Sequence, residues 1–317
     1  MKQIVLNQNV SLCPVAFGGT KRNDPKDHEE QFKIMDRYVE LGGNTFDSAR
    51  VYGHGNSDLG LGRWLKSRRV ERGSVRIVAK GSHPPMEQRF ISRLSKEEIQ
   101  GDLHDALRDI GTDYADVYIL HRDDPKLPVG PIMEALHELV VSGKTLAIGA
   151  SNWTAGRISM ANAYALENDL TPFTVSQLHH SLALTTPMLH GDLTQVPMNE
   201  TEAAYYRHTG IAVMAFGAMA RGYFHSKIAG KPLKAGPAQI YEPIPENGMR
   251  AWRLKQLCDE TGWTPGQVLG AYVRDGGMRG LPLCGFSSIA QLEETMAMEQ
   301  ICLNRSQICF LETGLRD

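Results

Sequence analysis

The sequence of 317 residues predicts an α/β protein, a (β/α)8 TIM barrel with an N-terminal β-hairpin and a C-terminal helical tail. Short apolar runs alternate with longer amphipathic runs from end to end, which indicates strands that alternate with helices. We count eight short runs, and eight strand–helix units joined by right-handed crossovers close a barrel. No Gly-x-Gly-x-x-Gly pattern follows any of these runs, which argues against the competing doubly wound open sheet.

The expected strands are short and rich in β-branched or other apolar residues, and helical patterns lie between them. One helix begins at a capping box of Ser95 and Glu98 and ends at Gly111. Residues 131–143 repeat this scheme, with Gly143 as the stop. The eight strands are predicted at residues 15–18, 44–48, 75–79, 115–120, 146–150, 173–178, 211–216 and 281–285.

A small hairpin is predicted before the first barrel strand. Ile4-Val5-Leu6 and Val10-Ser11-Leu12 flank Asn7-Gln8-Asn9, so the two segments can pair across a turn and close the bottom of the barrel. No linker rich in Pro, Ser or Gly interrupts the chain, and its composition does not change along it. We therefore expect residues 1–317 to form one domain.

Composition and charge exclude several classes of function. Hydrophobic residues make up 42% of the chain, and 34 Lys and Arg nearly balance 36 Asp and Glu, for a net charge of -2. That balance does not suit a protein that grips nucleic acid or an anionic membrane. The first ten residues lack a signal peptide's apolar stretch, and the five cysteines include no Cys-x-x-Cys pair. We expect a cytoplasmic protein with no nucleic-acid or membrane partner. Nothing in the sequence points to a particular oligomeric state.

Four reactive side chains are predicted at one end of the barrel. Active sites of such barrels form at the carboxyl ends of the strands. Asp47, Lys80 and His121 end three consecutive predicted strands, and Tyr52 lies in the loop after the first of them. Each residue alone has an ordinary interpretation, as a helix cap, a solvated lysine, a core histidine or a rim tyrosine. Together they predict proton delivery to a carbonyl group.

The expected chemistry centres on Tyr52. A free tyrosine has a pKa of about 10, and a nearby ammonium favours the phenolate. Lowering that pKa to about 7 would need about 4 kcal/mol, most of which a desolvated Lys80 could supply. Asp47 would keep Lys80 charged, His121 would hydrogen-bond the substrate oxygen, and no metal is needed.

These motifs resemble the signature of the aldo-keto reductases. The family has Thr and Glu where this chain has Ser48 and Asp58. The resemblance implies a barrel that binds NADPH without a Rossmann fold, with Tyr52 as the general acid, Lys80 and Asp47 as its tuners and His121 positioning the carbonyl. The matching segments are residues 43–49, 51–53, 57–58 and 61–62, the lysine strand at 78–81 and the histidine strand at 119–122.

The same resemblance implies the cofactor contacts. Many relatives place Arg or Lys at the positions of Ser287 and Gln291, and Asn at that of Thr295. We therefore expect NADPH to be preferred with weak discrimination against NADH. The implied contacts are Ser151, Asn152 and Gln177 for the carboxamide, Phe216 for the nicotinamide ring, Gly217, Met219 and Arg221 for the pyrophosphate, and Gly285, Ser287, Gln291 and Glu294 for the adenosine phosphate.

Three segments are expected to wall the substrate pocket, namely residues 81–93, 122–130 and 223–247. The third is rich in Gly, Pro and Lys and is predicted to be a mobile flap over the cofactor. Polar residues in the first two suit a hydroxylated, sugar-like aldehyde or ketone. The predicted function is NADPH-dependent reduction of an aldehyde or ketone to an alcohol.

A different class of function is a cofactor-binding regulatory or redox-sensing subunit with little turnover. The potassium-channel β-subunits, which belong to the same family, also carry neutral Ser and Gln near the adenosine. Such a subunit would have a partner-binding extension, for which we expect no room before the strand at 15–18.

Two further enzyme classes fit the sequence poorly. A metal-dependent barrel hydrolase needs a ligand cluster, but no His-x-His pair occurs. His179 and His180 are adjacent, so on a strand they point to opposite faces and are expected in the core or at the rim. Cys284 is expected to be a packing residue. A short-chain dehydrogenase would need a Tyr-x-x-x-Lys pair, which we expect this chain to lack.

Overall fold

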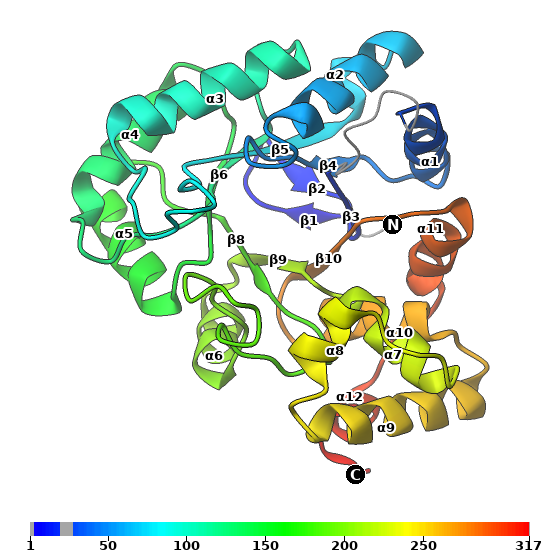
Figure 1. Cartoon of the computed structure of the whole chain (residues 1–317). Helices are drawn as coiled ribbons and strands as arrows, with labels where there is room; N and C mark the ends of the chain where they lie inside the picture. Colours follow the sequence, from blue (N-terminus) through cyan, green and yellow to red (C-terminus); the bar gives the residue numbers. More distant parts are fainter. Residues whose placement is uncertain (1–2, 20–27, 317) are drawn as a thin grey trace.

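The computed structural model describes residues 3–19 and 28–316. Its eight parallel strands close a barrel in the order β10-β3-β4-β5-β6-β7-β8-β9 (Figure 1). Every predicted strand is present, so the predicted TIM barrel is confirmed. The strands are β3 (Ala16–Gly18), β4 (Thr45–Asp47), β5 (Arg76–Gly81), β6 (Val117–Leu120), β7 (Ile148–Ser151), β8 (Val175–His179), β9 (Ala212–Phe216) and β10 (Gly280–Cys284).

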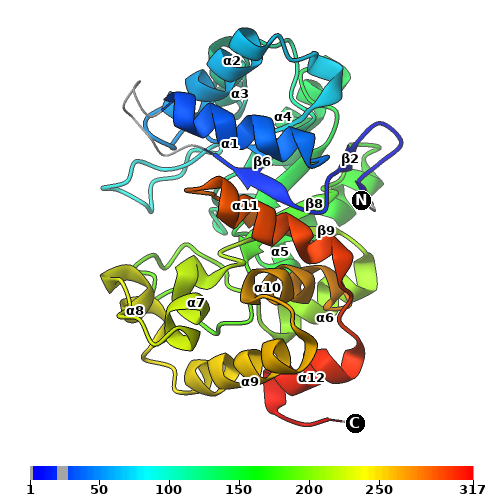
Figure 2. The ribbon, with the colours of Figure 1, turned by 90° about the vertical axis from the view of Figure 1, so that its right-hand side faces the viewer.

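Helices surround the barrel. Figure 2 shows α9, α10 and α12 in its lower half, α11 across the middle, and α2 and α3 at the top. Within the described residues, no helix combines the length and the apolar character needed to cross a membrane. The helices are α1 (His28–Glu40), α2 (Asn56–Arg68), α3 (Lys96–Ile110), α4 (Val129–Val141), α5 (Ala155–Glu167), α6 (Glu200–Thr209), α7 (Tyr223–Ile228), α8 (Ala235–Tyr241), α9 (Glu246–Thr261), α10 (Pro265–Asp275), α11 (Ile289–Met296) and α12 (Arg305–Thr313), with short 3-10 turns η2 (Arg72–Ser74), η3 (Ala220–Gly222) and η4 (Ala297–Gln300).

The predicted hairpin is confirmed. β1 (Ile4–Val5) pairs antiparallel with β2 (Ser11–Leu12). Its Leu12 side chain is buried among residues that fill the barrel interior, including Val117 and Leu281. Asn7 donates a hydrogen bond of 3.0 Å to the Leu146 carbonyl, just before β7. The hairpin therefore covers the amino ends of the strands and leaves the carboxyl ends free.

Helix ends follow the local signals in the sequence. The Ser95–Glu98 capping box opens α3, and Gly111 ends it with a left-handed φ of 78°. The second predicted helix, at 131–143, runs from Val129 to Val141 instead, because the extended backbone of Pro128 lets the helix start directly after it.

The expected flap at 223–247 is wrong as a loop prediction. The segment forms α7 and α8, and Tyr223, Phe224, Ile240 and Tyr241 are buried in the main hydrophobic core. These apolar pairs anchor both ends of the segment, which outweighs its content of Gly, Pro and Lys. The segment is a packed part of the molecule.

Candidate active site

The structure brings the four predicted catalytic residues together. Asp47 is the last residue of β4, Lys80 lies near the end of β5 and His121 follows β6, and these three strands are neighbours. The Lys80 ammonium donates a hydrogen bond to Asp47 Oδ2. Lys80 Nζ also lies 4.8 Å from the centroid of the Tyr52 ring, and the Tyr52 and His121 rings are 5.6 Å apart, edge to face. The cluster can therefore act on a single substrate oxygen.

The lysine in this cluster is a buried cation. Lys80 is 0% exposed and Asp47 2%. Burial alone lowers the pKa of Lys80, but the Asp47 carboxylate and the Tyr52 hydroxyl outweigh it, and the pKa is raised. Gln177 Nε2 donates to the other oxygen of Asp47, Oδ1, at 2.8 Å. The carboxylate is thus held from two sides, and Lys80 stays protonated at neutral pH.

The pKa of Tyr52 differs from the value expected from the sequence. Desolvation raises the pKa of Tyr52, and this outweighs the lowering by the Lys80 ammonium and by Arg122, so its pKa lies above 10. The predicted fall toward 7 is therefore wrong in direction. The main reason is the burial of the phenol, which disfavours the phenolate, and the nearby Asp47 carboxylate raises the pKa of Tyr52 further. The phenol is neutral and carries a proton to give.

His121 is a neutral imidazole with one ring nitrogen, Nδ1, left without a hydrogen bond among the described residues. Burial, together with Arg122 and Lys80, holds its pKa well below 6.5. Its Nδ1 is buried and has no hydrogen-bond partner among the described residues. The His83 ring packs edge-on against it at 4.8 Å and is also neutral, with its pKa lowered to about 4 by burial. An unpaired buried nitrogen is costly, so it is well suited to a substrate atom.

A network of charged side chains that was not predicted from the sequence lies beside the cluster. The buried Arg122 donates to the His121 carbonyl at 2.8 Å and to Asp192 Oδ2 at 3.1 Å. Arg89 reaches the same Asp192 oxygen at 3.3 Å. These contacts join the loops that follow β5, β6 and β8. Arg122 directly follows His121 in the sequence, and this position next to a predicted catalytic residue is the feature from which its role could have been predicted.

The predicted carboxamide contacts also lie together. Ser151, the last residue of β7, is paired in register with Gln177 in the middle of β8. Asn152 Nδ2 donates to Ser151 Oγ at 3.0 Å, while its Oδ1 accepts from the Val196 amide at 3.2 Å. Because Gln177 also contacts Asp47, this group borders the catalytic cluster. Its amide and hydroxyl groups match the donors and acceptors of a carboxamide.

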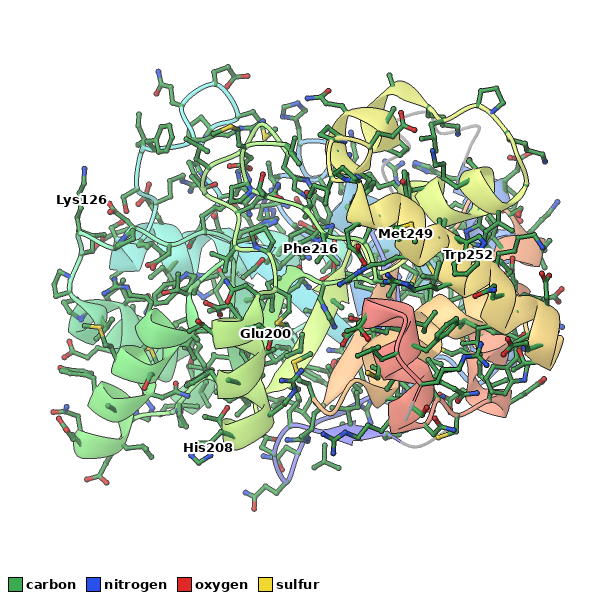
Figure 3. All side chains as sticks on the ribbon, turned by 90° about the horizontal axis from the view of Figure 1, so that it is seen from below. Lys126, Glu200, His208, Phe216, Met249 and Trp252 are labelled. Atoms are coloured by element: carbon green, nitrogen blue, oxygen red, sulfur yellow. The ribbon has the colours of Figure 1, made fainter. Side chains whose placement is uncertain are left out.

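The predicted nicotinamide and pyrophosphate residues follow β9. Phe216 is partly exposed at the end of β9, and Figure 3 places it near the middle of the molecule. Gly217 has φ of 75°, and Ala220, Arg221 and Gly222 all have positive φ as well, so the chain turns sharply after the strand. Met219 lies just before these three residues, and Arg221 is exposed. The backbone geometry and the exposed cation fit a phosphate ligand.

The predicted adenosine segment follows β10. An added Cβ at Gly285 would meet no atom within 4 Å, so the backbone there is open to a ligand. Ser287 and Gln291 are exposed and bonded to each other at 2.7 Å. Glu294 faces elsewhere, because its carboxylate accepts from the Gly266 amide at 3.0 Å and lies 3.6 Å from His225. Its carboxylate is thus engaged within the protein, and Glu294 is not among the cofactor contacts that we propose.

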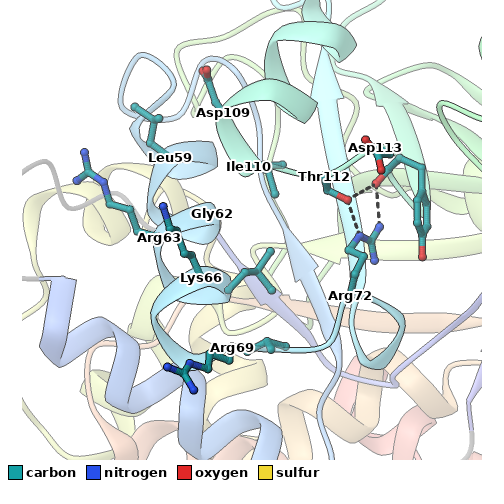
Figure 4. A pocket seen from close by; sticks show the side chains of 14 residues that line it. Leu59, Gly62, Arg63, Lys66, Arg69, Arg72, Asp109, Ile110, Thr112 and Asp113 are labelled. Carbon is teal, nitrogen blue, oxygen red and sulfur yellow. Dashed lines mark hydrogen bonds between the residues drawn. The ribbon is translucent and has the colours of Figure 1, made fainter.

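Several features lie apart from this site. A hollow of about 680 Å³ lies between α2 and the end of α3 and contains none of the predicted site residues (Figure 4). The described part of the chain holds no group of three or more His, Cys, Asp or Glu side chains arranged for a metal ion. Cys284 and His180 are buried, and burial raises the pKa of the Cys284 thiol to about 12.

The expectation that the chain lacks the Tyr-x-x-x-Lys pair of a short-chain dehydrogenase is wrong. Tyr223 and Lys227 do form a Tyr-x-x-x-Lys pair, on α7. Lys227 donates to Glu242 at 3.0 Å, and the Tyr223 ring is buried in the core. The closed barrel, rather than the absence of this pair, distinguishes the chain from an open-sheet dehydrogenase.

Fold and site together define a (β/α)8 barrel with proton-transfer groups at its mouth. The Aldo/keto reductase family model matches residues 14–312, and the chain belongs to this family. It is an NAD(P)H-dependent oxidoreductase.

Many known proteins resemble the chain, among them the following three. It is 27% identical to norsolorinic acid reductase of Aspergillus flavus, over 89% of this chain and 70% of that protein. It is 31% identical to aryl-alcohol dehydrogenase (NADP(+)) of Phanerodontia chrysosporium, over 55% and 49% of the two chains. A crystal structure of the thermostable aldo-keto reductase Tm1743 with the inhibitor epalrestat shares the fold, with a TM-score of 0.75 and 18% identity over 99% of both chains.

Proposed function

We propose that this protein reduces an aromatic aldehyde or ketone to the alcohol with NADPH, and that Tyr52 donates the proton. One observation carries the proposal. The neutral phenol of Tyr52 lies between a buried ammonium, Lys80, and a neutral imidazole, His121. That arrangement supplies a proton donor, a stabilising charge and a hydrogen-bonding group within reach of one oxygen.

The chain's own residues act on the carbonyl oxygen, while the bound cofactor supplies hydride to the carbonyl carbon. His121 orients the oxygen by a hydrogen bond from its ring. Tyr52 then gives its hydroxyl proton to that oxygen, which becomes the alcohol hydroxyl. The phenolate left behind is stabilised by the Lys80 ammonium, and Asp47 keeps that ammonium in place. Solvent returns the proton to Tyr52 before the next turnover.

Residues in β7, β8 and β9, together with the segments that follow β7, β9 and β10, would hold the cofactor. Ser151, Asn152 and Gln177 are the proposed carboxamide partners, and Phe216 the stacking ring. Gly217, Met219 and Arg221 belong to the turn proposed for the pyrophosphate, and Gly285, Ser287 and Gln291 to the segment proposed for the adenosine phosphate.

NADPH is the proposed cofactor, with NADH as a weaker ligand. Ser287 and Gln291 are neutral hydrogen-bonding groups, which bind a 2′-phosphate less strongly than Arg or Lys would. The name of the Phanerodontia relative includes NADP(+). The expected ratio of the two dissociation constants is therefore below about tenfold in favour of NADPH. A tenfold preference for NADH in a binding titration would contradict this assignment.

The loops at the mouth favour an aromatic substrate over the sugar-like one expected from the sequence. Exposed apolar side chains stand on the loop after β5, where Phe90 is 79% exposed, and on the loop after β8, where Met188 is 77% exposed. Met86, Ile91 and Leu193 extend this apolar rim. Burial of these apolar side chains against an aromatic ring system stabilises the complex. Contact with the hydroxyl groups of a sugar stabilises it little. The Phanerodontia and Aspergillus relatives carry names that refer to aryl alcohols and to norsolorinic acid.

A substrate screen tests this proposal. Purified protein would be mixed with NADPH or NADH and with aromatic aldehydes, polycyclic ketones and sugar aldehydes, and cofactor oxidation followed by absorbance. We expect aromatic carbonyls to be reduced with kcat/KM at least about tenfold above that of the sugars. Reduction of sugars alone would contradict the substrate class. Oxidation of neither cofactor with any compound would contradict the function.

A further inference from the structure

We infer that His179 is a positioning residue for the nicotinamide end of the cofactor, and that a hydrogen bond from Tyr241 on α8 holds it in place. This inference rests on the proposed function, because it concerns the seat formed by Phe216. His179 is not among the residues predicted to touch the cofactor, and Tyr241 was included only as part of the segment 223–247 expected to wall the pocket.

His179 contacts the proposed seat directly. It is the last residue of β8 and pairs in register with Phe216 on β9. The two rings meet edge to face, with centroids 5.5 Å apart and planes at 85°. Phe216 can stack on a ligand with its free face only while its other neighbours hold the ring in place. His179, whose side chain is 3% exposed, is one of those neighbours.

His179 also limits the turn after Phe216. A Cβ on Gly217 would lie 2.5 Å from His179 Nε2, so only glycine fits beside this imidazole. Gly217 has φ of 75°, which glycine adopts at little cost. The imidazole therefore occupies the space against which the proposed pyrophosphate turn is folded.

Tyr241 fixes the imidazole. Its hydroxyl lies 3.2 Å from His179 Nε2. Burial raises the pKa of Tyr241 to about 12 and lowers that of His179 to about 3, so the phenol is protonated and the imidazole neutral. With the imidazole proton on Nδ1, the hydroxyl donates and Nε2 accepts. The His190 ring also packs edge to face against His179, with the ring centroids 4.8 Å apart.

Asn247 extends the network to the loop after β8. Its side chain is 0% exposed, accepts from the Leu184 amide at 2.7 Å and donates to the Leu184 carbonyl at 2.9 Å. The same Nδ2 donates to the Tyr241 carbonyl at 2.9 Å. One buried amide thus ties the apolar-rimmed loop to Tyr241, and Tyr241 ties it to His179 and Phe216. The network therefore joins His179 to Tyr241, which lies 62 positions further along the chain, and Leu184 to Asn247, which lies 63 positions further along.

Tyr241→Phe tests the inference by binding measurements. Titration calorimetry would compare NADP+ with 2′,5′-ADP, a probe that lacks the nicotinamide. We expect NADP+ to bind about three- to tenfold more weakly to the variant, because one buried hydrogen bond is lost and Phe216 is less fixed. Binding of 2′,5′-ADP should stay within about twofold, since its proposed segment follows β10.

Tyr206→Phe is the matched control. Tyr206 is equally buried, and its hydroxyl bonds to Ser176, also on β8, at 2.8 Å. This variant loses a similar buried hydrogen bond away from the seat and should bind NADP+ as the wild type does. His179→Phe keeps a ring beside Phe216 but lacks the acceptor, so the double variant with Tyr241→Phe should be no weaker than the weaker single variant.

The outcomes separate this inference from the proposed function. Equal weakening of both ligands, equal weakening in Tyr206→Phe, or unchanged NADP+ binding in Tyr241→Phe would overturn the role of His179 and Tyr241. Failure of the wild type to bind NADP+ at all would overturn the proposed function itself.

Discussion

At the scale of single residues, Tyr52 is subject to opposing influences. Desolvation and the Asp47 carboxylate favour the neutral phenol, while Lys80 and Arg122 favour the phenolate. Desolvation dominates, so the pKa of Tyr52 is raised. A neutral donor suits reduction, because the proton is present on Tyr52 throughout the neutral range.

The pH dependence of reduction should reflect this. The protonated phenol is the active form, so activity is lost as pH rises through the raised pKa of Tyr52. His121 is already neutral, since its pKa lies well below 6.5. We expect kcat/KM for the carbonyl substrate to be flat from about pH 6 to 9 and to fall only above about pH 10. A midpoint near 7 in the measured profile would show that Lys80 dominates after all.

Lys80→Met should destabilise the protein strongly. The substitution leaves the Asp47 carboxylate buried, with Gln177 as its remaining hydrogen-bond partner among the described residues. The expected loss in the free energy of unfolding is about 3–5 kcal/mol at pH 7. Part of it should return at pH 5, because an unpaired buried carboxyl has a raised pKa and becomes neutral as pH falls. Urea denaturation measures both values.

Lys66→Met is the control for that experiment. Lys66 is exposed on α2, so its replacement should change the free energy of unfolding by less than about 0.5 kcal/mol. An equally small effect for Lys80→Met would refute the buried ion pair.

The sequence was sufficient to predict the catalytic residues but not their supports. Asp47, Lys80 and His121 stand at strand ends, and strand ends can be recognised from local patterns. The partners of Arg122 and Tyr241 lie 70 and 62 positions away. No local pattern specifies such contacts, because they depend on how the loops pack.

At the scale of elements, α2 and α3 approach each other closely at a glycine. A Cβ on Gly62 in α2 would lie 2.5 Å from the Ile110 carbonyl at the end of α3. Gly101, inside α3, has no atom within 4 Å of such a Cβ. Two helical glycines thus have opposite surroundings.

Alanine substitution should therefore have opposite effects at these sites. Gly62→Ala should lower the free energy of unfolding by about 1–3 kcal/mol, because the helices must move apart. Gly101→Ala should raise it by about 0.5–1 kcal/mol, because alanine loses less backbone entropy in a helix. Thermal and urea unfolding of the two variants check this, and a shared sign would contradict the packing described.

The segment 223–247 shows where element prediction from composition fails. Its Gly, Pro and Lys content is typical of a loop, yet Tyr223 and Tyr241 lie in the main core. Four apolar residues placed at the two ends of the segment were enough to fold it against α9 and the barrel. Burial decided the structure there, and local propensity did not.

At the scale of the whole molecule, the barrel follows from the number and order of its strand–helix units. All eight predicted strands form, in sequence order around the barrel. The closed sheet brings residues 47, 80, 121, 151, 177 and 216 to one mouth. Parallel strands with right-handed crossovers allow that arrangement to be predicted without knowledge of side-chain packing.

The most direct test of the proposed function is turnover by Tyr52→Phe. The variant keeps the ring beside Lys80 and His121 and lacks only the hydroxyl. With NADPH and the best aromatic aldehyde, we expect kcat to fall by about 10³-fold or more while the dissociation constant for NADPH stays within about threefold. Tyr164→Phe, which removes a hydroxyl bonded to Glu134 on the outer helices, should turn over as the wild type does. Wild-type turnover by Tyr52→Phe would contradict the assignment of the proton donor and, with it, the proposed mechanism.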